Sequence, residues 1–276
     1  MIIGVIGSIT KDRIVIEKTK DEFHQVGGTV YYSSLTLVHN GSSVIAIPLL
    51  AEKDSYLLKH LKHNNMSIYP GWTNKTTVYE NRYPADSQDI CERIIIEHAS
   101  DFSLPNNLLQ NLSVCSAIHV GPLSYNEFSY DTYTNLRKNF HGIIGLDGQG
   151  FLQGKHGFFD EVISENIDII KLSPHELLKI TYETDEIRAL QKLKQLGIHE
   201  IVITRGSHGS TIYYNHERYD IPAYEQQNIV DATGCGDTYF AAYLLKRAEK
   251  YSPEDSAKYA SMIAAKKLAY RGPIGE

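Results

Sequence analysis

The sequence predicts an α/β protein in which helices cover both faces of a mostly parallel sheet, with a small second sheet projecting from it. Short apolar runs of strand length alternate with segments of helical spacing through most of the 276 residues. This alternation is typical of a parallel sheet with crossover helices. Hydrophobic residues make up 42% of the chain and charged residues 22%, which allows a packed core. Two polar, alternating segments interrupt the pattern and predict the second sheet.

The strands of the main sheet are expected at six short apolar runs. They lie at residues 2–6, 43–47, 117–120, 143–146, 167–172 and 201–204. Before the last of these, Thr184 is expected to cap a helix that has Asp185 in its first turn and ends at Gly197. The strand that starts near residue 201 then follows at once.

Four runs of alternating polarity predict the small sheet, because alternation is typical of strands with one exposed face. They lie at residues 14–17, 22–26, 76–82 and 92–98. We therefore expect one domain over residues 1–276, with lid strands inserted at about 13–26 and 76–99. A flap over a site and a structural extension of the sheet edge explain these strands equally well. Since unpaired strand edges invite association, the lid also predicts a homodimer.

Charge and composition exclude several classes of partner. Lys and Arg number 27 against 33 Asp and Glu, and a net charge of −6 argues against binding to nucleic acid or a membrane surface. No apolar run approaches the roughly 20 residues of a transmembrane helix. The three scattered cysteines, Cys91, Cys115 and Cys235, indicate reduced thiols and a cytoplasmic protein.

The segment DATGCGDT at residues 231–238 carries the strongest chemical signal, since an apolar helix follows it directly. Backbone N–H groups at a helix N-terminus lack partners within the helix and carry the positive end of its dipole. Glycines let an anion approach them, so Gly234, Cys235 and Gly236 can form an anion cradle. Asp237 suits the helix dipole there, and a carboxylate beside such a cradle is also where a base for an attacking hydroxyl belongs.

This Asp-x-Thr-Gly-x-Gly-Asp segment resembles the signature of the ribokinase-like (PfkB) carbohydrate kinase family. Four further segments resemble motifs of that family in the same order along the chain. They are GSITKD (7–12), the glycine pair at 27–28, KLSPHE (171–176) and VITRGSHG (202–209). The resemblance covers nearly the whole chain and implies a three-layer α/β/α fold, with the inserted strands as its lid.

The resemblance implies transfer of the γ-phosphoryl group of ATP, with magnesium, to a hydroxyl of a polyol, sugar or nucleoside. It implies that Asp237 is the base, that Gly234, Cys235 and Gly236 hold the phosphoryl group, and that Asp12 binds substrate hydroxyls. Glu176 would organise magnesium, although Ser173 stands where the family has Asn. Gly27 and Gly28 would approach the substrate at the hinge of the flap, and Thr204, Gly206 and Gly209 would border the nucleotide. A monovalent-cation site near Asp231 and Thr233 is left open.

Two features bear on the acceptor. GGTVYY (27–32) and DGQGFL (147–152) are similar to the inositol-kinase-like branch of the family, in which Gln149 would bind a ring hydroxyl or simply pin a loop. Tyr31 and Tyr32 would stack on a nucleobase or pack in the core. A sugar-phosphate acceptor would need cations near Asp12, for which Lys11, Arg13, Arg82 and Arg93 are available. The leading hypothesis is a sugar or cyclitol kinase. The alternatives are a nucleoside kinase and a non-catalytic ligand sensor.

Overall fold

A ten-stranded sheet forms the centre of the computed structural model, which describes residues 1–83, 92–154, 157–164 and 166–275. The strand order is β14-β13-β12-β11-β10-β9-β1-β4-β5, with β6 paired to β4. Neighbouring strands are parallel except for the antiparallel pairs β12–β13 and β13–β14, so only β13 runs against the others. The strands are β1 (Ile2–Ser8), β4 (Ser43–Ala51), β5 (Met66–Ile68), β6 (Gly71–Thr73), β9 (Ala117–Gly121), β10 (Ile143–Asp147), β11 (Ile169–Leu172), β12 (Glu200–Thr204), β13 (Ser210–Tyr214) and β14 (Glu217–Ile221). The predicted fold class is confirmed.

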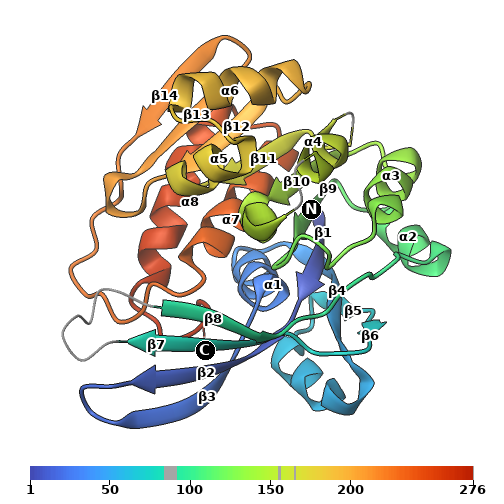
Figure 1. Cartoon of the computed structure of the whole chain (residues 1–276), viewed down its shortest axis with the longest axis vertical. Helices are drawn as coiled ribbons and strands as arrows, with labels where there is room; N and C mark the ends of the chain where they lie inside the picture. The colour runs from blue at the N-terminus through green and yellow to red at the C-terminus, as the bar shows by residue number, and fades with distance from the viewer. Residues whose placement is uncertain (84–91, 155–156, 165, 276) are drawn as a thin grey trace.

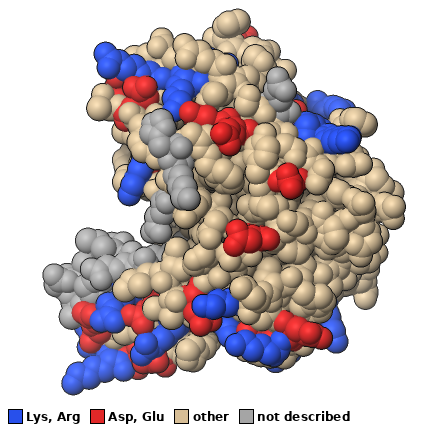
Figure 2. Space-filling view, turned by 45° about the vertical axis from the view of Figure 1, so that its right-hand side comes forward, with Lys and Arg blue, Asp and Glu red and all other residues tan. Residues whose placement is uncertain are grey.

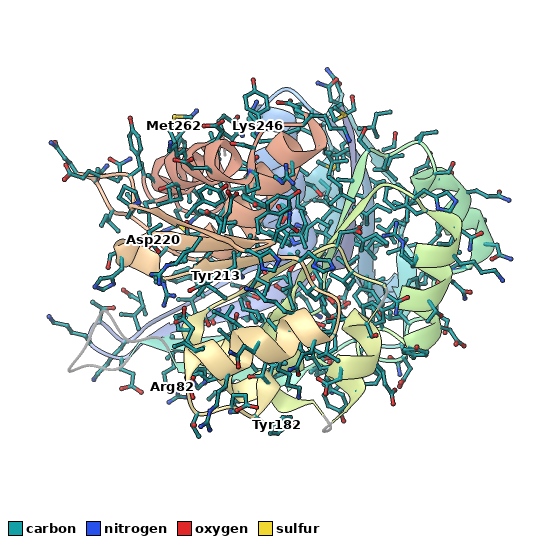
Figure 3. The ribbon with its side chains drawn as sticks, turned by 90° about the horizontal axis from the view of Figure 1, so that it is seen from above. Arg82, Tyr182, Tyr213, Asp220, Lys246 and Met262 are labelled. Carbon is teal, nitrogen blue, oxygen red and sulfur yellow. The ribbon has the colours of Figure 1, made fainter. Side chains whose placement is uncertain are left out.

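Helices cover both faces of this sheet, which gives three layers. Seen from above, the helices that carry Lys246 and Met262 lie on one side of the sheet, and the helix that ends beside Tyr182 lies on the other (Figure 3). The first face is covered by α1 (Thr29–His39), the 3-10 helix η1 (Glu52–Leu61), α7 (Cys235–Ala248) and α8 (Pro253–Lys267). The second is covered by α2 (Asn106–Leu112), α3 (Tyr130–Asn139), α4 (Phe158–Ile163), α5 (Pro174–Thr181) and α6 (Glu186–Gln195). Short 3-10 turns, η2 (Gly148–Gln153) and η3 (Gly206–His208), follow β10 and β12.

A second, four-stranded sheet projects from this body at the lower edge of Figure 1, and we call it the lid. Its strands are β2 (Thr10–Ile16), β3 (Asp21–Gly27), β7 (Val78–Tyr83) and β8 (Glu92–Glu97). They are ordered β3-β2-β7-β8, with a parallel pair at the centre and antiparallel pairs outside it. Figure 2 shows that Lys and Arg and Asp and Glu are interspersed on the face in view.

The first lid strand begins at Thr10, four residues before the predicted start. Thr10, Asp12 and Ile14 are buried, while Lys11 and Arg13 between them are half-buried. This is the period of two of a strand, but its first two buried positions hold the polar residues Thr10 and Asp12, so hydrophobicity alone did not reveal its start. Asp12 consequently lies on a lid strand, opposite Gln25 of β3 and Tyr79 of β7.

The predicted cap of α6 was wrong by one residue. The N-cap is Asp185, whose side chain accepts a hydrogen bond of 2.9 Å from the Arg188 amide. Thr184 precedes it and has no part in the helix. Both residue types cap helices well, and the register is decided by which side chain can reach the amide three residues on.

No helix among the described residues is long and apolar enough to cross a bilayer. Cys115 and Cys235 are unbridged thiols, and Cys91 lies outside the described residues.

Candidate active site

A cavity of about 200 Å³ lies between the lid and the carboxyl ends of the central strands. Ligands of open α/β sheets bind at this edge of the sheet. The lining draws on the lid, the start of α1, the loops after β9 and β10, strand β11 and the loop that leads into α7. The lining residues are Thr10, Asp12, Gly28, Tyr32, Tyr79, Leu123, Gln149, Lys171, Ala232, Thr233, Gly234, Gly236 and Asp237.

Helix α7 begins at one end of this cavity. Its N-cap, Gly234, has a left-handed backbone with φ 74° and ψ 4°. A Cβ at this position would lie 2.2 Å from the ring of Tyr32, so only glycine fits. The first turn therefore starts against the cavity wall, with Gly236 and Asp237 both lining the cavity. Most of the segment 231–238 thus lines the cavity where the helix begins, and its role as an anion cradle stays a prediction.

Cys235 lies in the same turn, but its side chain is directed elsewhere. The Cys235 Sγ donates to the Ala264 carbonyl on α8 at 3.9 Å, and burial raises the pKa of the thiol to about 11. Its backbone N–H donates to the Ala232 carbonyl at 3.2 Å, a bond that a bound anion would have to replace. The thiol is thus protonated and turned toward α8, which leaves Cys235 only its backbone to offer a ligand.

A buried ion pair joins the cavity to the central sheet. The Lys171 Nζ lies 2.7 Å from Asp147 Oδ2, and the side chains are 6% and 4% exposed. Burial by itself would lower the pKa of Lys171, but the charges of Asp147 and Glu176 outweigh it and raise that pKa. The Nζ also lies 3.2 Å from where a Cβ on Gly236 would stand. A permanent positive charge therefore sits beside the first turn of α7.

Asp12 is held at the lid side of the cavity. It is 5% exposed, and its Oδ1 accepts a hydrogen bond of 2.6 Å from Thr10 Oγ1. Its Oδ2 accepts a longer one, of 3.5 Å, from Asn81 Nδ2. A Cβ on Gly27 would approach Asp12 Oδ2 to 2.5 Å, so the glycine leaves room for the carboxylate. Gly28 follows at φ 94° and begins α1 against the same wall.

The comparisons with known proteins agree with this geometry. Residues 154–276 match the model of the pfkB family carbohydrate kinases. A 2-dehydro-3-deoxygluconokinase of Dickeya dadantii is 28% identical over 123 residues, which cover 44% of this chain and 39% of that protein. The family match thus spans the C-terminal part of the chain, which includes α5, α7 and Asp237.

Solved structures extend the likeness to the whole fold. A pyrophosphate-dependent kinase in the ribokinase family, complexed with a pyrophosphate analog and myo-inositol, has a TM-score of 0.80 at 23% identity. That match covers 99% of this chain and 97% of the other. A ribokinase of Arabidopsis thaliana complexed with ribose and ATP has a TM-score of 0.79 at 19% identity, covering 99% and 94%. At these identities the likeness establishes the ribokinase-like fold.

Six of the predicted site residues lie outside the cavity lining: Gly27, Cys235, Glu176, Thr204, Gly206 and Gly209. Thr204, Gly206 and Gly209 lie at the end of β12 and in the turn that follows it. Glu176 is three residues into α5, where it forms a capping box: Glu176 Oε2 accepts from the Ser173 amide at 2.7 Å, and Ser173 Oγ accepts from the Glu176 amide at 3.2 Å. Their roles toward nucleotide and magnesium stay predictions. Gln149, by contrast, lines the cavity.

The sequence reasoning missed Lys171. The signal was present, because a lysine in the middle of an otherwise apolar, fully buried strand needs a partner. Sequence alone did not identify that partner, since Asp147 is 24 residues away on the neighbouring strand.

Carboxylates already hold the lid's described cations. Lys11 pairs with Asp54 at 3.0 Å, Arg13 with Glu22 and Glu80, and Arg82 with Glu80 and Glu17. The side chain of Arg93 lies outside the described ones. This pairing weakens the case for a phosphorylated acceptor bound from the lid side.

Beneath the cavity, one buried carboxyl ties several strand ends together. Glu127 Oε1 accepts from Ser8 Oγ at 2.8 Å, and Oε2 accepts from the Leu123 amide at 2.6 Å. Ser8 Oγ also lies 3.2 Å from Thr77 Oγ1, beside the first residue of β7. Burial raises the pKa of Glu127 to about 7, although its hydrogen bonds oppose that rise.

This raised pKa predicts a pH-dependent stability. Since the folded protein binds the Glu127 proton more tightly than the unfolded chain does, the stabilisation is complete below pH ~4.5 and is lost as pH rises through 7. Between pH 5 and 8 the free energy of unfolding of the wild type should fall by about 2.5 kcal/mol more than that of Glu127→Gln. Urea unfolding at both pH values measures the difference. Glu161→Gln, on the exposed side of α4, should follow the wild type, and equal slopes for Glu127→Gln and wild type would refute the assignment.

Proposed function

We propose that this chain is a kinase that transfers the γ-phosphoryl group of ATP to a hydroxyl of a small sugar or cyclitol. One arrangement carries the proposal. The start of α7, Asp237 and Lys171 form one end of a cavity, and Asp12 on the lid forms the other. The chain spans about two fifths of the length of the curated relative described above, so the activity of the whole protein is inferred from this site.

Phosphoryl transfer depends mainly on alignment and on stabilising the negative charge that spreads over the phosphoryl oxygens. The backbone of Gly234, Cys235 and Gly236 would hold these oxygens, and the Lys171 ammonium would add a fixed positive charge beside them. Asp237 would accept the proton of the acceptor hydroxyl as its oxygen bonds to phosphorus. The bond from phosphorus to the leaving ADP oxygen breaks in the same step.

The polar groups opposite this turn favour a polyol. Asp12 is an acceptor for two adjacent hydroxyls, and Thr10 and Gln149 stand beside it on the cavity wall. Tyr31 is 3% exposed and packs in the core. Tyr32 lines the cavity but is only 2% exposed, and its ring packs against Gly234, so neither ring offers an open face to a nucleobase. A sugar or cyclitol therefore fits this cavity better than a nucleoside, in line with the myo-inositol bound by the solved kinase of similar fold.

On the donor side, Thr204, Gly206 and Gly209 would border the nucleotide. Glu176 would hold magnesium, and the bound ion would supply positive charge to the donor phosphates. Among the described residues no three His, Cys, Asp or Glu side chains gather into a metal site. This fits magnesium, which is commonly held by one or two carboxylates, waters and the substrate's own phosphates.

Replacing the base should reduce turnover and leave the fold intact. Asp237→Asn removes the proton acceptor and keeps the size of the side chain, so kcat should fall by about 10²–10⁴-fold. The coupled release of ADP measures kcat, and circular dichroism checks the fold. Asp131→Asn, in the first turn of α3 and exposed, is the matched control and should keep full turnover. Near-normal turnover of Asp237→Asn would remove Asp237 from this role.

The charge of Lys171 should matter for turnover separately from its role in folding. Lys171→Met leaves Asp147 buried without its partner, which should cost about 3 kcal/mol of stability. Lys171→Met with Asp147→Asn removes both charges and should recover much of that stability. Turnover should nevertheless fall in both variants by about 10²–10³-fold, the cost of losing one donor to the transition state. If turnover recovers together with stability, Lys171 acts only in the fold.

The acceptor is identified by a panel of myo-inositol, other cyclitols, hexoses, pentoses and nucleosides. Each is tested with ATP and, because the solved kinase of similar fold is pyrophosphate-dependent, with pyrophosphate. We expect saturable phosphoryl transfer to a cyclitol or sugar. Transfer only to nucleosides would support the nucleoside kinase, and calorimetric binding of a polyol without transfer to it would support the ligand sensor.

A further inference from the structure

Lys267, the last residue of α8, is fully buried, with 0% of its side chain exposed. An ammonium group in such a place must be satisfied by oxygen atoms, because burying it without partners is very costly. Its Nζ lies 2.8 Å from the Asp231 carbonyl oxygen, 3.2 Å from Asp231 Oδ2 and 3.4 Å from the Tyr270 carbonyl oxygen. Two backbone carbonyls and one carboxylate therefore converge on one positive charge.

This cluster is attached to the anion cradle through Asp231. The other Asp231 oxygen, Oδ1, accepts from the Thr233 amide at 2.8 Å. Burial alone would raise the pKa of the Asp231 carboxyl, but this bond and the Lys267 charge hold it below the usual value. The carboxylate therefore stays ionised and fixes the turn one residue before Gly234.

Tyr32 connects the same charge to the cradle by packing. The Lys267 Nζ lies 5.6 Å from the centre of the Tyr32 ring, within the range of a cation–π contact. The ring also lies against Gly234, where a Cβ would come 2.2 Å from it. Lys267, Tyr32 and Gly234 are thus stacked in sequence, with the ammonium behind the cradle.

The oxygens around Lys267 bear directly on the monovalent-cation site that the sequence left open near Asp231 and Thr233. Carbonyl and carboxylate oxygens are the ligands that such an ion would need, and here the lysine ammonium takes them. A second positive ion in the same cluster would be repelled by the first. The residues present therefore do not fit a separate monovalent ion.

We propose that Lys267 is a positioning residue that serves as a built-in monovalent cation for the anion cradle, so that the chain needs no dissolved potassium or sodium. The inference rests on the proposed function, since it concerns the loop that would hold the phosphoryl group. A lysine that only stabilised the fold would be equally buried. The two roles differ in whether a small free cation can take its place.

The test uses Lys267→Ala, which removes the ammonium and leaves room for an ion, and Lys267→Met, which fills the same space without charge. Pyrophosphate is the probe, and its affinity is measured by calorimetry in potassium, ammonium or choline chloride at constant ionic strength. Wild type should bind equally in all three salts. Lys267→Ala should bind pyrophosphate roughly tenfold more weakly than the wild type in choline chloride, and its affinity should recover in potassium or ammonium chloride. Lys267→Met should bind pyrophosphate weakly in every salt. Lys266→Ala, exposed on the same helix, should behave as wild type.

Turnover in the same three salts is the second readout and should follow the same pattern. Strong activation of the wild type by potassium would overturn the proposal, as would equal affinity of Lys267→Ala and wild type in choline. A Lys267→Ala variant that folds but binds pyrophosphate weakly in every salt would also overturn it, because Lys267 would then only stabilise the fold. If that variant does not fold, the wild-type comparison still decides whether a free ion is needed. Because the pyrophosphate measurement needs no acceptor, it stands even if the panel finds no kinase activity.

Discussion

The first turn of α7 is the part of the site on which the rest depends, because it brings Gly234, Gly236 and Asp237 together at the cavity wall. Such a turn is useful only if it keeps its shape when no anion is bound. Three contacts hold it: the Tyr32 ring packs against Gly234, the Asp231 carboxylate accepts from the Thr233 amide, and Lys171 lies beside Gly236. The turn is thus positioned by groups on α1 and β11 and by Asp231, which Lys267 of α8 holds in turn, so its geometry depends on more than the loop alone.

The lid supplies the opposite wall by a different means. Asp12 is fixed by Thr10 on its own strand, and it has space only because residue 27 has no side chain. Since β2 continues directly from β1, the lid is tied to the central sheet next to the buried Ser8–Glu127 hydrogen bond. Motion of the lid would therefore move Asp12 relative to Asp237. This would let one hinge control whether a hydroxyl held at Asp12 comes close to Asp237, the proposed base.

The sequence was informative where function depends on local backbone geometry, and much less so where it depends on contacts between distant residues. The turn at 231–238 could be recognised because its glycines and Asp237 act within a few residues of one another. Lys171 and Lys267 could not, because their partners lie 24 and 36 residues away and a lone lysine is ordinarily a surface residue. The start of the strand that carries Asp12 was placed too late for a related reason: its first two buried positions, Thr10 and Asp12, are polar, so the alternation there was not one of hydrophobicity.

The two buried lysines act on the same turn from different sides, and their surroundings indicate different tasks. Lys171 lines the cavity, so its charge can reach a bound phosphoryl group directly. Lys267 is separated from the cavity by the Tyr32 ring and is surrounded by oxygens of the chain itself. Its charge is largely used in holding Asp231 and the end of α8. A chain with a net charge of −6 thus places two buried cations beside the turn proposed to bind the phosphoryl group, Lys171 at the cavity wall and Lys267 behind the Tyr32 ring.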